Sequence, residues 1–109
     1  MPKLADIRLT AMDDAPQMAA LLNEIIAVGG TTAFEDPVTA QDMVDWYIAA
    51  RLLDCCHVAV DDAGDIAGFQ SVEHDEVPNG TGYIATFARR SPVVKGVGTA
   101  LFEATQRFA

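Results

Sequence analysis

Hydrophobic residues recur along this chain at two spacings, which predict helices and strands in a mixed order. Apolar positions three or four residues apart, as on one face of a helix, run through residues 18–26, 43–50 and 99–109. Short apolar or alternating runs, typical of strands, lie at residues 7–9, 56–60, 66–72 and 81–88. The order β-α-α-β-β-β-α predicts a mixed α/β (α+β) fold, with a mainly antiparallel sheet flanked by helices.

Capping and turn residues mark where these elements begin and end. Pro16, just after two aspartates, predicts a helix start, and the glycines at 29–30 predict the end of that helix. Thr39 followed by Asp42 fits a capping box at the next helix. Residues 61–65, Asp-Asp-Ala-Gly-Asp, predict the turn of an antiparallel hairpin between the second and third strands.

The composition favours a single globular domain over residues 1–109. Half of the 109 residues are hydrophobic and 21% are charged, a balance that suits a packed core. No apolar run approaches the roughly 20 residues of a membrane-spanning helix. The first residues also lack the apolar stretch of a secretory signal. We therefore predict a cytoplasmic protein without a membrane partner.

The charge is strongly negative overall but reverses toward the C-terminus. Seven basic and sixteen acidic residues give a net charge of −9, which disfavours binding to nucleic acid. Residues 83–109, in contrast, carry a net charge of +3. This last quarter of the chain could therefore hold an anionic small molecule.

The two cysteines give no sign of a disulfide or a metal site. Cys55 and Cys56 are adjacent, and neighbours in a strand point to opposite faces, so a bond between them would be strained. The chain has no C-x-x-C pair and no zinc-ligand spacing. We predict two reduced cysteines in a buried strand and no bound metal.

The most informative segment is Lys-Gly-Val-Gly-Thr at residues 95–99, between a strand and a helix. Glycine lets the backbone approach a ligand closely, and the first N–H groups of a helix lack internal partners and can bind phosphate. The spacing excludes a Walker A loop, because no lysine follows Gly98, and a Rossmann turn, because Leu101 stands where a third glycine belongs. The segment is a candidate pyrophosphate cradle, or a glycine-softened loop before a core helix.

The strand, loop, Gly-x-Gly and helix of residues 81–102 resemble motif A of the GNAT N-acetyltransferase superfamily. The hairpin and the two N-terminal helices also follow that family's order. Residues 30–37, Gly-Thr-Thr-Ala-Phe-Glu-Asp-Pro, are similar to the acceptor-side loop of phosphinothricin-acetyltransferase-like members. The resemblance implies an enzyme that moves an acetyl group from acetyl-CoA, its co-substrate, to a primary amine of a small molecule by direct attack.

The resemblance also implies roles for individual residues. Backbone N–H groups would bind the CoA pyrophosphate at Lys95, Gly96, Val97, Gly98 and Thr99. The pantetheine arm and acetyl carbonyl would lie along Thr86, Phe87 and Ala88. The acceptor amine would meet Thr32, Phe34 and Glu35. Glu73 could relay a proton or end a solvated strand, and Tyr83 could donate to an oxyanion or pack in the core.

The chain also departs from the family's pattern. Residues 83–85 contain no acid that could serve as a base, and the further strands and helix of the family do not follow Ala109. The predicted fold is thus interrupted after the motif-A helix. This leaves open a non-catalytic acyl-CoA-binding or oligomerisation module, or a piece of a longer enzyme. An edge strand carrying Ile84 and Phe87, and a helix exposing Leu101, Phe102 and Phe108, predict a homo-oligomer.

Overall fold

A computed structural model describes residues 3–28, 36–49, 53–73, 83–89 and 94–108 of the chain. The elements follow the predicted order: β1 (Leu4–Leu9), η1 (Met12–Asp14), α1 (Ala15–Val28), α2 (Ala40–Met43), η2 (Val44–Ile48), β2 (Leu53–Asp61), β3 (Ile66–Glu73), β4 (Tyr83–Ala88) and α3 (Val97–Phe108). The predicted capping box is confirmed, because the Thr39 side chain accepts from the Asp42 N–H and the Asp42 carboxylate accepts from the Thr39 N–H. No helix in the described ranges is long and apolar enough to cross a membrane.

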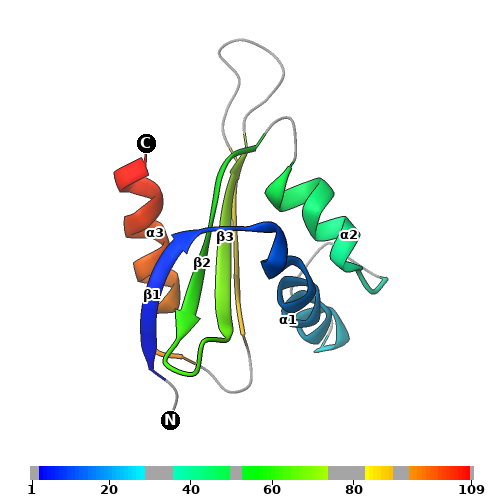
Figure 1. The fold of residues 1–109 in the computed structure, drawn as a ribbon, viewed down its shortest axis with the longest axis horizontal. Helices are drawn as coiled ribbons and strands as arrows, with labels where there is room; N and C mark the ends of the chain where they lie inside the picture. The colour runs from blue at the N-terminus through cyan, green and yellow to red at the C-terminus, as the bar shows by residue number, and fades with distance from the viewer. Residues whose placement is uncertain (1–2, 29–35, 50–52, 74–82, 90–93, 109) are drawn as a thin grey trace.

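The four strands form one antiparallel sheet in the order β1-β2-β3-β4. As predicted, β2 and β3 form a hairpin around the turn that begins at Asp61. Helix α3 lies on one side of the sheet, and α1 and α2 lie on the other (Figure 1). The sheet therefore separates two hydrophobic cores.

The larger core lies between the sheet and the two N-terminal helices. Its fully buried centre includes Met18, Leu22, Met43, Val58 and Phe69. The smaller core lies under α3 and contains Ala59, Ala67, Val94, Val97 and Leu101. In β2, Val58 and Val60 contribute to the larger core and Ala59 to the smaller one, as expected for side chains that alternate across a strand.

Helix α3 differs from its prediction in where it begins and which face it buries. It begins at Val97, two residues earlier than the sequence pattern indicated. The buried stripe is Val97, Leu101, Ala104 and Thr105, so the predicted exposure of Leu101 was wrong. Phe102 lies one position off this stripe and is 45% exposed, and Phe108 at the helix end is 53% exposed.

Helix α3 can pack so closely on the sheet because residue 68 in β3 is glycine. A Cβ at this position would lie 2.6 Å from Val97 Cγ1 and 2.9 Å from the carbonyl oxygen of Phe87. Neither distance is possible for a real Cβ, so the first turn of α3 could not stay where it is above an alanine. Gly68 thus fixes the start of α3 against the junction of β3 and β4.

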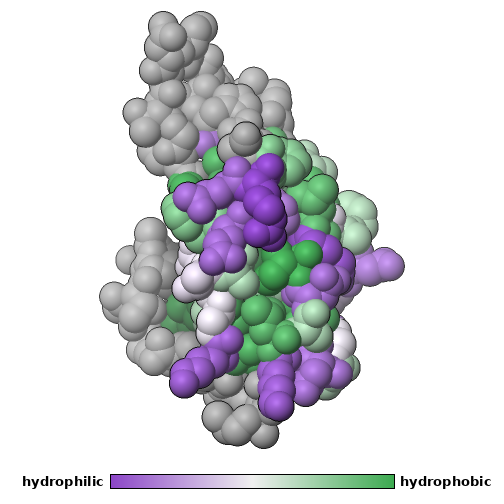
Figure 2. All heavy atoms as spheres, turned by 90° about the vertical axis from the view of Figure 1, so that its left-hand side faces the viewer, coloured by the Kyte–Doolittle hydropathy of each residue, from purple (hydrophilic) through white to green (hydrophobic). Residues whose placement is uncertain are grey.

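Apolar side chains also reach the surface on the face that carries α3. Figure 2 shows hydrophobic surface there among charged side chains. The large exposed hydrophobic residues of the described chain include Leu9 at 52%, Phe102 and Phe108. Ile84 of the edge strand β4 is 52% exposed as well, whereas Phe87 packs in the larger core. The homo-oligomer expected from the sequence stays a prediction.

His57 is buried beneath α3 with one ring nitrogen that lacks a hydrogen-bond partner. Its side chain is 7% exposed, and no described residue bonds its Nδ1. The imidazole meets the Phe108 ring edge-on at a centroid distance of 5.9 Å. Burial, with a smaller contribution from the positive charge of Arg107, lowers the pKa of His57.

We predict that Gly68→Ala destabilises the protein by about 1–3 kcal/mol, because the added methyl group overpacks the contact with Val97 and Phe87. Gly98→Ala is the matched control: its Cβ would meet nothing within 4 Å, and alanine favours the helix by up to about 1 kcal/mol. Urea unfolding of both variants measures the difference. Equal stability of the two would contradict this account of the helix–sheet contact.

We further predict that acidification from pH 7 to pH 5 lowers the free energy of unfolding through His57. The folded state resists protonation of this ring, so below about pH 6.5 the unfolded chain binds more protons and gains stability. Asp14 and Asp61 have lowered pKa values, so their stabilising effect is lost only at lower pH, around 4 and below.

The measurement compares urea unfolding of His57 and His57→Gln proteins at pH 7, 6 and 5. Both carry His74→Gln, which leaves His57 as the one histidine that differs between them. The glutamine variant is expected to show a flatter pH dependence. Parallel curves for the two proteins would mean that His57 has the same pKa in the folded and unfolded chains.

Candidate functional site

The candidate site begins at the turn that leads into α3. Gly96 has a φ of +83°, a left-handed conformation that favours glycine. Its carbonyl oxygen accepts the Ala100 N–H at 3.0 Å, which closes the first helical turn. The N–H groups of Val97, Gly98 and Thr99 therefore come before the first intrahelical donor and point out of the helix start. This is the positive end of the helix dipole.

The second glycine, Gly98, is not required by the fold of the described chain. Its φ is not positive, and a Cβ there would meet nothing within 4 Å. Glycine in a helix costs up to about 1 kcal/mol relative to alanine, and nothing within the described residues offsets that cost. Lys95, Gly96 and Thr99 are exposed beside it, whereas the Val97 side chain is buried. The first turn of α3 thus presents bare backbone to solvent.

The open edge of β4 lies directly beside this turn. Gly68 pairs with Ala88 in the sheet register. A Cβ on Gly68 would lie 3.4 Å from the Ala88 Cα as well as against Val97. The start of α3 and the end of β4 therefore meet over the same glycine, although eight residues separate Ala88 from Val97 in the sequence.

The register decides which β4 residues turn their backbone groups toward that edge. The Arg89 N–H donates to the Ala67 carbonyl at 2.8 Å. Because such pairs alternate in an antiparallel ladder, Phe87 bonds β3, whereas Thr86 and Ala88 direct their N–H and C=O groups away from it. Within the described residues, no strand pairs with that side of β4. The Phe87 ring packs against Phe69 at a centroid distance of 5.1 Å.

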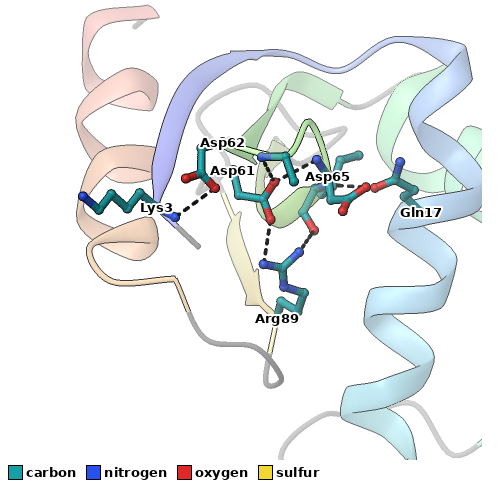
Figure 3. A network of polar contacts seen from close by, with 8 residues as sticks. Lys3, Gln17, Asp61, Asp62, Asp65 and Arg89 are labelled. Atoms are coloured by element: carbon teal, nitrogen blue, oxygen red, sulfur yellow. Dashed lines mark hydrogen bonds and ion pairs between the residues drawn. The ribbon is translucent and has the colours of Figure 1, made fainter. Parts of the chain in front are cut away.

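An ion pair holds the end of β4 to the β2–β3 turn (Figure 3). Arg89 Nη2 donates to Asp61 Oδ2 at 2.9 Å, and both side chains are largely buried. The other oxygen of Asp61 accepts the N–H groups of Ala63 and Asp65 at 3.0 and 2.9 Å. The Asp65 N–H and the Arg89 guanidinium are the main causes of the lowered pKa of Asp61. The segment that leaves β4 therefore starts from a fixed point.

The two candidate catalytic residues, Glu73 and Tyr83, are paired in register between the neighbouring strands β3 and β4. Glu73 ends β3, is half-buried, and pairs in register with Tyr83 at the start of β4. The negative charge of Glu73 adds to the effect of burial that raises the pKa of Tyr47 to about 12. Glu73 lies four residues after Phe69 in β3, and Phe69 packs in the larger core, so strand alternation places the carboxylate on the α1 and α2 side of the sheet. The Tyr83 side chain lies outside the described part of the structure.

The structure brings together some of the predicted residues and leaves others aside. Residues 95–99 and 86–88 meet at one place, as described above. The predicted acceptor-side residues Thr32, Phe34 and Glu35 lie outside the described residues. Gly68 and the Asp61–Arg89 pair were not identified from the sequence as parts of the site. A lone glycine inside a strand pattern was the signal for Gly68, because it often marks a close backbone approach.

Comparison with known proteins supports the predicted family. The chain is 28% identical over 106 residues to YwnH of Bacillus subtilis, which is provisionally named a phosphinothricin acetyltransferase. The match covers 94% of this chain and 65% of YwnH. Scanned against models of protein families, the sequence matches none.

Solved structures give the same answer for the fold. A crystal structure provisionally described as a phosphinothricin N-acetyltransferase matches with a TM-score of 0.76 and 28% identity, over 94% of this chain and 64% of that one. A GNAT superfamily phosphinothricin acetyltransferase from Sinorhizobium meliloti, in complex with acetyl-CoA, matches with a TM-score of 0.76 and 19% identity. That match covers 95% of this chain and 59% of that one.

The chain therefore spans less than two thirds of the length of these relatives. Over that span the order of helices and strands along the chain agrees with the expectation from the sequence. The sequence and structural similarities show that this chain shares the fold of phosphinothricin N-acetyltransferase-like GNAT proteins, and that it is shorter than the relatives that it matches.

Proposed function

We propose that this protein is an N-acetyltransferase that moves the acetyl group of acetyl-CoA to a primary amine of a small molecule. The observation that carries the proposal is the bare first turn of α3 beside the open edge of β4, joined over Gly68. A relative with the same fold, from Sinorhizobium meliloti, contains acetyl-CoA. The next paragraphs assign each part of that molecule to residues of this chain.

The pyrophosphate fits the turn at residues 95–99. The unpaired N–H groups of Val97, Gly98 and Thr99 are donors for phosphate oxygens, and the helix dipole favours the negative charge. The exposed Lys95 adds a positive charge next to them. The positive φ of Gly96 turns the chain into the helix at this point. The lack of a Cβ on Gly98 leaves room for the ligand against the backbone.

The pantetheine arm fits the β4 edge next to the cradle. Its amide groups can bond the outward N–H and C=O groups of Thr86 and Ala88, as a neighbouring strand would. Phe87 contributes differently, because its ring packs against Phe69 and Tyr47 and holds β4 in register. The acetyl end would then lie toward Tyr83 and Glu73, at the opposite end of β4 from the cradle.

The reaction needs little beyond positioning and one proton acceptor. The amine nitrogen bonds to the acetyl carbon, the carbon–sulfur bond breaks, and the thiolate of CoA leaves and takes up a proton. Glu73 would accept the proton that the amine loses. Tyr83 would donate a hydrogen bond to the carbonyl oxygen as negative charge develops on it. Thr32, Phe34 and Glu35 would contact the amine.

We predict that Gly98→Ala weakens CoA binding at least about tenfold while leaving the fold as stable as before or more so. The methyl group would occupy the space of a phosphate oxygen and costs about 1.4 kcal/mol or more in binding. Calorimetric titration with CoA measures the affinity, and urea unfolding measures the stability. Gly96 is less suitable for this test, because its positive φ makes any substitution strain the turn.

Glu103→Ala is the matched control, since residue 103 is exposed on the same helix but away from its first turn. It should leave CoA affinity within about twofold. Wild-type affinity in a folded Gly98→Ala protein would show that the pyrophosphate does not bind at this turn.

We predict that Glu73→Gln lowers kcat about a hundredfold, at the low end of the range for losing a general base. CoA affinity should be unchanged, because Glu73 is remote from the cradle. Release of CoA thiol in the presence of a panel of primary amines measures turnover, with Glu103→Gln as the control. A wild-type protein that binds acetyl-CoA but acetylates no amine would instead favour a non-catalytic acyl-CoA-binding module.

A further inference from the structure

Three polar side chains form a hydrogen-bonded row from beneath α3 to the open edge of the sheet. Gln70 in β3 and Thr105 in α3 are 2% and 6% exposed, so both are buried between the helix and the sheet. Thr105 Oγ1 donates to Gln70 Oε1 at 2.5 Å, and Gln70 Nε2 donates to Thr86 Oγ1 at 2.7 Å. The row ends at Thr86, which is exposed on β4.

The direction of these bonds leaves one donor without a partner inside the row. A threonine hydroxyl has a single proton to donate and lone pairs that accept. Thr105 donates its hydroxyl proton to the Gln70 side-chain oxygen. This bond orients the amide so that its NH₂ group faces Thr86. Because Thr86 Oγ1 accepts from that group, its own proton points away from Gln70. The row thus leaves the Thr86 hydroxyl proton to be donated to a partner outside the row.

Burying an amide at this position has a cost that apolar side chains would avoid. A buried polar group is tolerated where its hydrogen bonds are made, and a valine or leucine pair could fill the same space under α3. Hydrogen bonds linked in such a row make its members rigid. What it makes rigid here is a hydroxyl on the strand edge, beside the backbone groups of Thr86 that the register also directs outward.

We infer that Gln70 and Thr105 are positioning residues, which hold the Thr86 hydroxyl as a hydrogen-bond donor to a carbonyl oxygen of bound acyl-CoA. The inference rests on the proposed function, because it takes the β4 edge as the place of the acyl-pantetheine arm. The arm offers two kinds of acceptor, the amide carbonyls present in CoA and acetyl-CoA alike, and the thioester carbonyl of acetyl-CoA. A hydroxyl held in one orientation favours either one over water.

The test measures the affinity of Thr86→Val and Thr105→Val for CoA and for acetyl-CoA by calorimetry. Thr86→Val keeps the shape and removes the donor, and should weaken binding roughly 3- to 10-fold, the net value of one hydrogen bond. Thr105→Val frees Gln70 to turn its oxygen toward Thr86, which would draw the hydroxyl proton inward and produce a loss of similar size. Thr86→Ser and Thr105→Ser keep the hydroxyl groups and should retain most of the affinity.

The double variant Thr86→Val/Thr105→Val separates positioning from a general loss of structure. If Thr105 acts through Thr86, the double variant binds no more weakly than Thr86→Val. Equal losses for CoA and acetyl-CoA would assign the arm's amide carbonyl, and a loss for acetyl-CoA alone would assign the thioester carbonyl. Either result supports the inference.

Two outcomes would overturn it. The first is wild-type affinity for both ligands in a folded Thr86→Val protein, which would leave the cradle assignment intact. The second is losses that add in the double variant, which would mean that Thr105 acts on the fold rather than through Thr86. Failure of the wild-type protein to bind either ligand is a different result, because it would reject the acyl-CoA site itself and this inference with it.

Discussion

The contact of Val97 with Gly68 is the constraint on which the rest of the site depends. It lets the first turn of α3 lie against the sheet where β3 and β4 pair, within the space that a single methyl group would fill. A helix start and a strand edge that are separated in sequence thereby become neighbours. Without that approach, the exposed N–H groups of α3 and the outward backbone groups of β4 would belong to different parts of the surface.

Glycine stands at positions 68, 96 and 98 for three different physical reasons. Gly68 is required by crowding, since helix and strand atoms occupy the space beside it. Gly96 is required by backbone conformation, since its φ is +83°. Gly98 is required by neither within the described chain, and the proposed binding of CoA against its backbone would account for it. Because the three look alike in sequence, the Gly-x-Gly pattern by itself does not separate the glycine that the fold requires, Gly96, from the one that it does not, Gly98.

Partly buried polar contacts hold β4, the edge strand of the described sheet, at both its end and its middle. The Asp61–Arg89 pair fixes the end of β4 to the β2–β3 turn, with the second carboxylate oxygen of Asp61 bonded by backbone N–H groups of the turn. Gln70 bonds Thr86 in the middle of the strand and is itself bonded from α3. An edge strand lacks half of its possible ladder bonds, so such side-chain bonds help to keep it straight and in register.

The sequence by itself determined the element order, the hairpin, the capping box at Thr39 and the Gly-x-Gly turn, because each depends on neighbours within a few residues. It also led to the resemblance to GNAT proteins, since motif A is a local pattern of strand, turn and helix. Tertiary structure decided where α3 begins and which face it buries, because Val97 packs directly against Gly68. The same holds for the outward-facing backbone of Thr86 and Ala88 and for the row from Thr105 to Thr86. These features depend on sheet register and on helix-to-sheet distance, which arise from contacts between residues far apart in the chain and leave no periodic signal in the sequence.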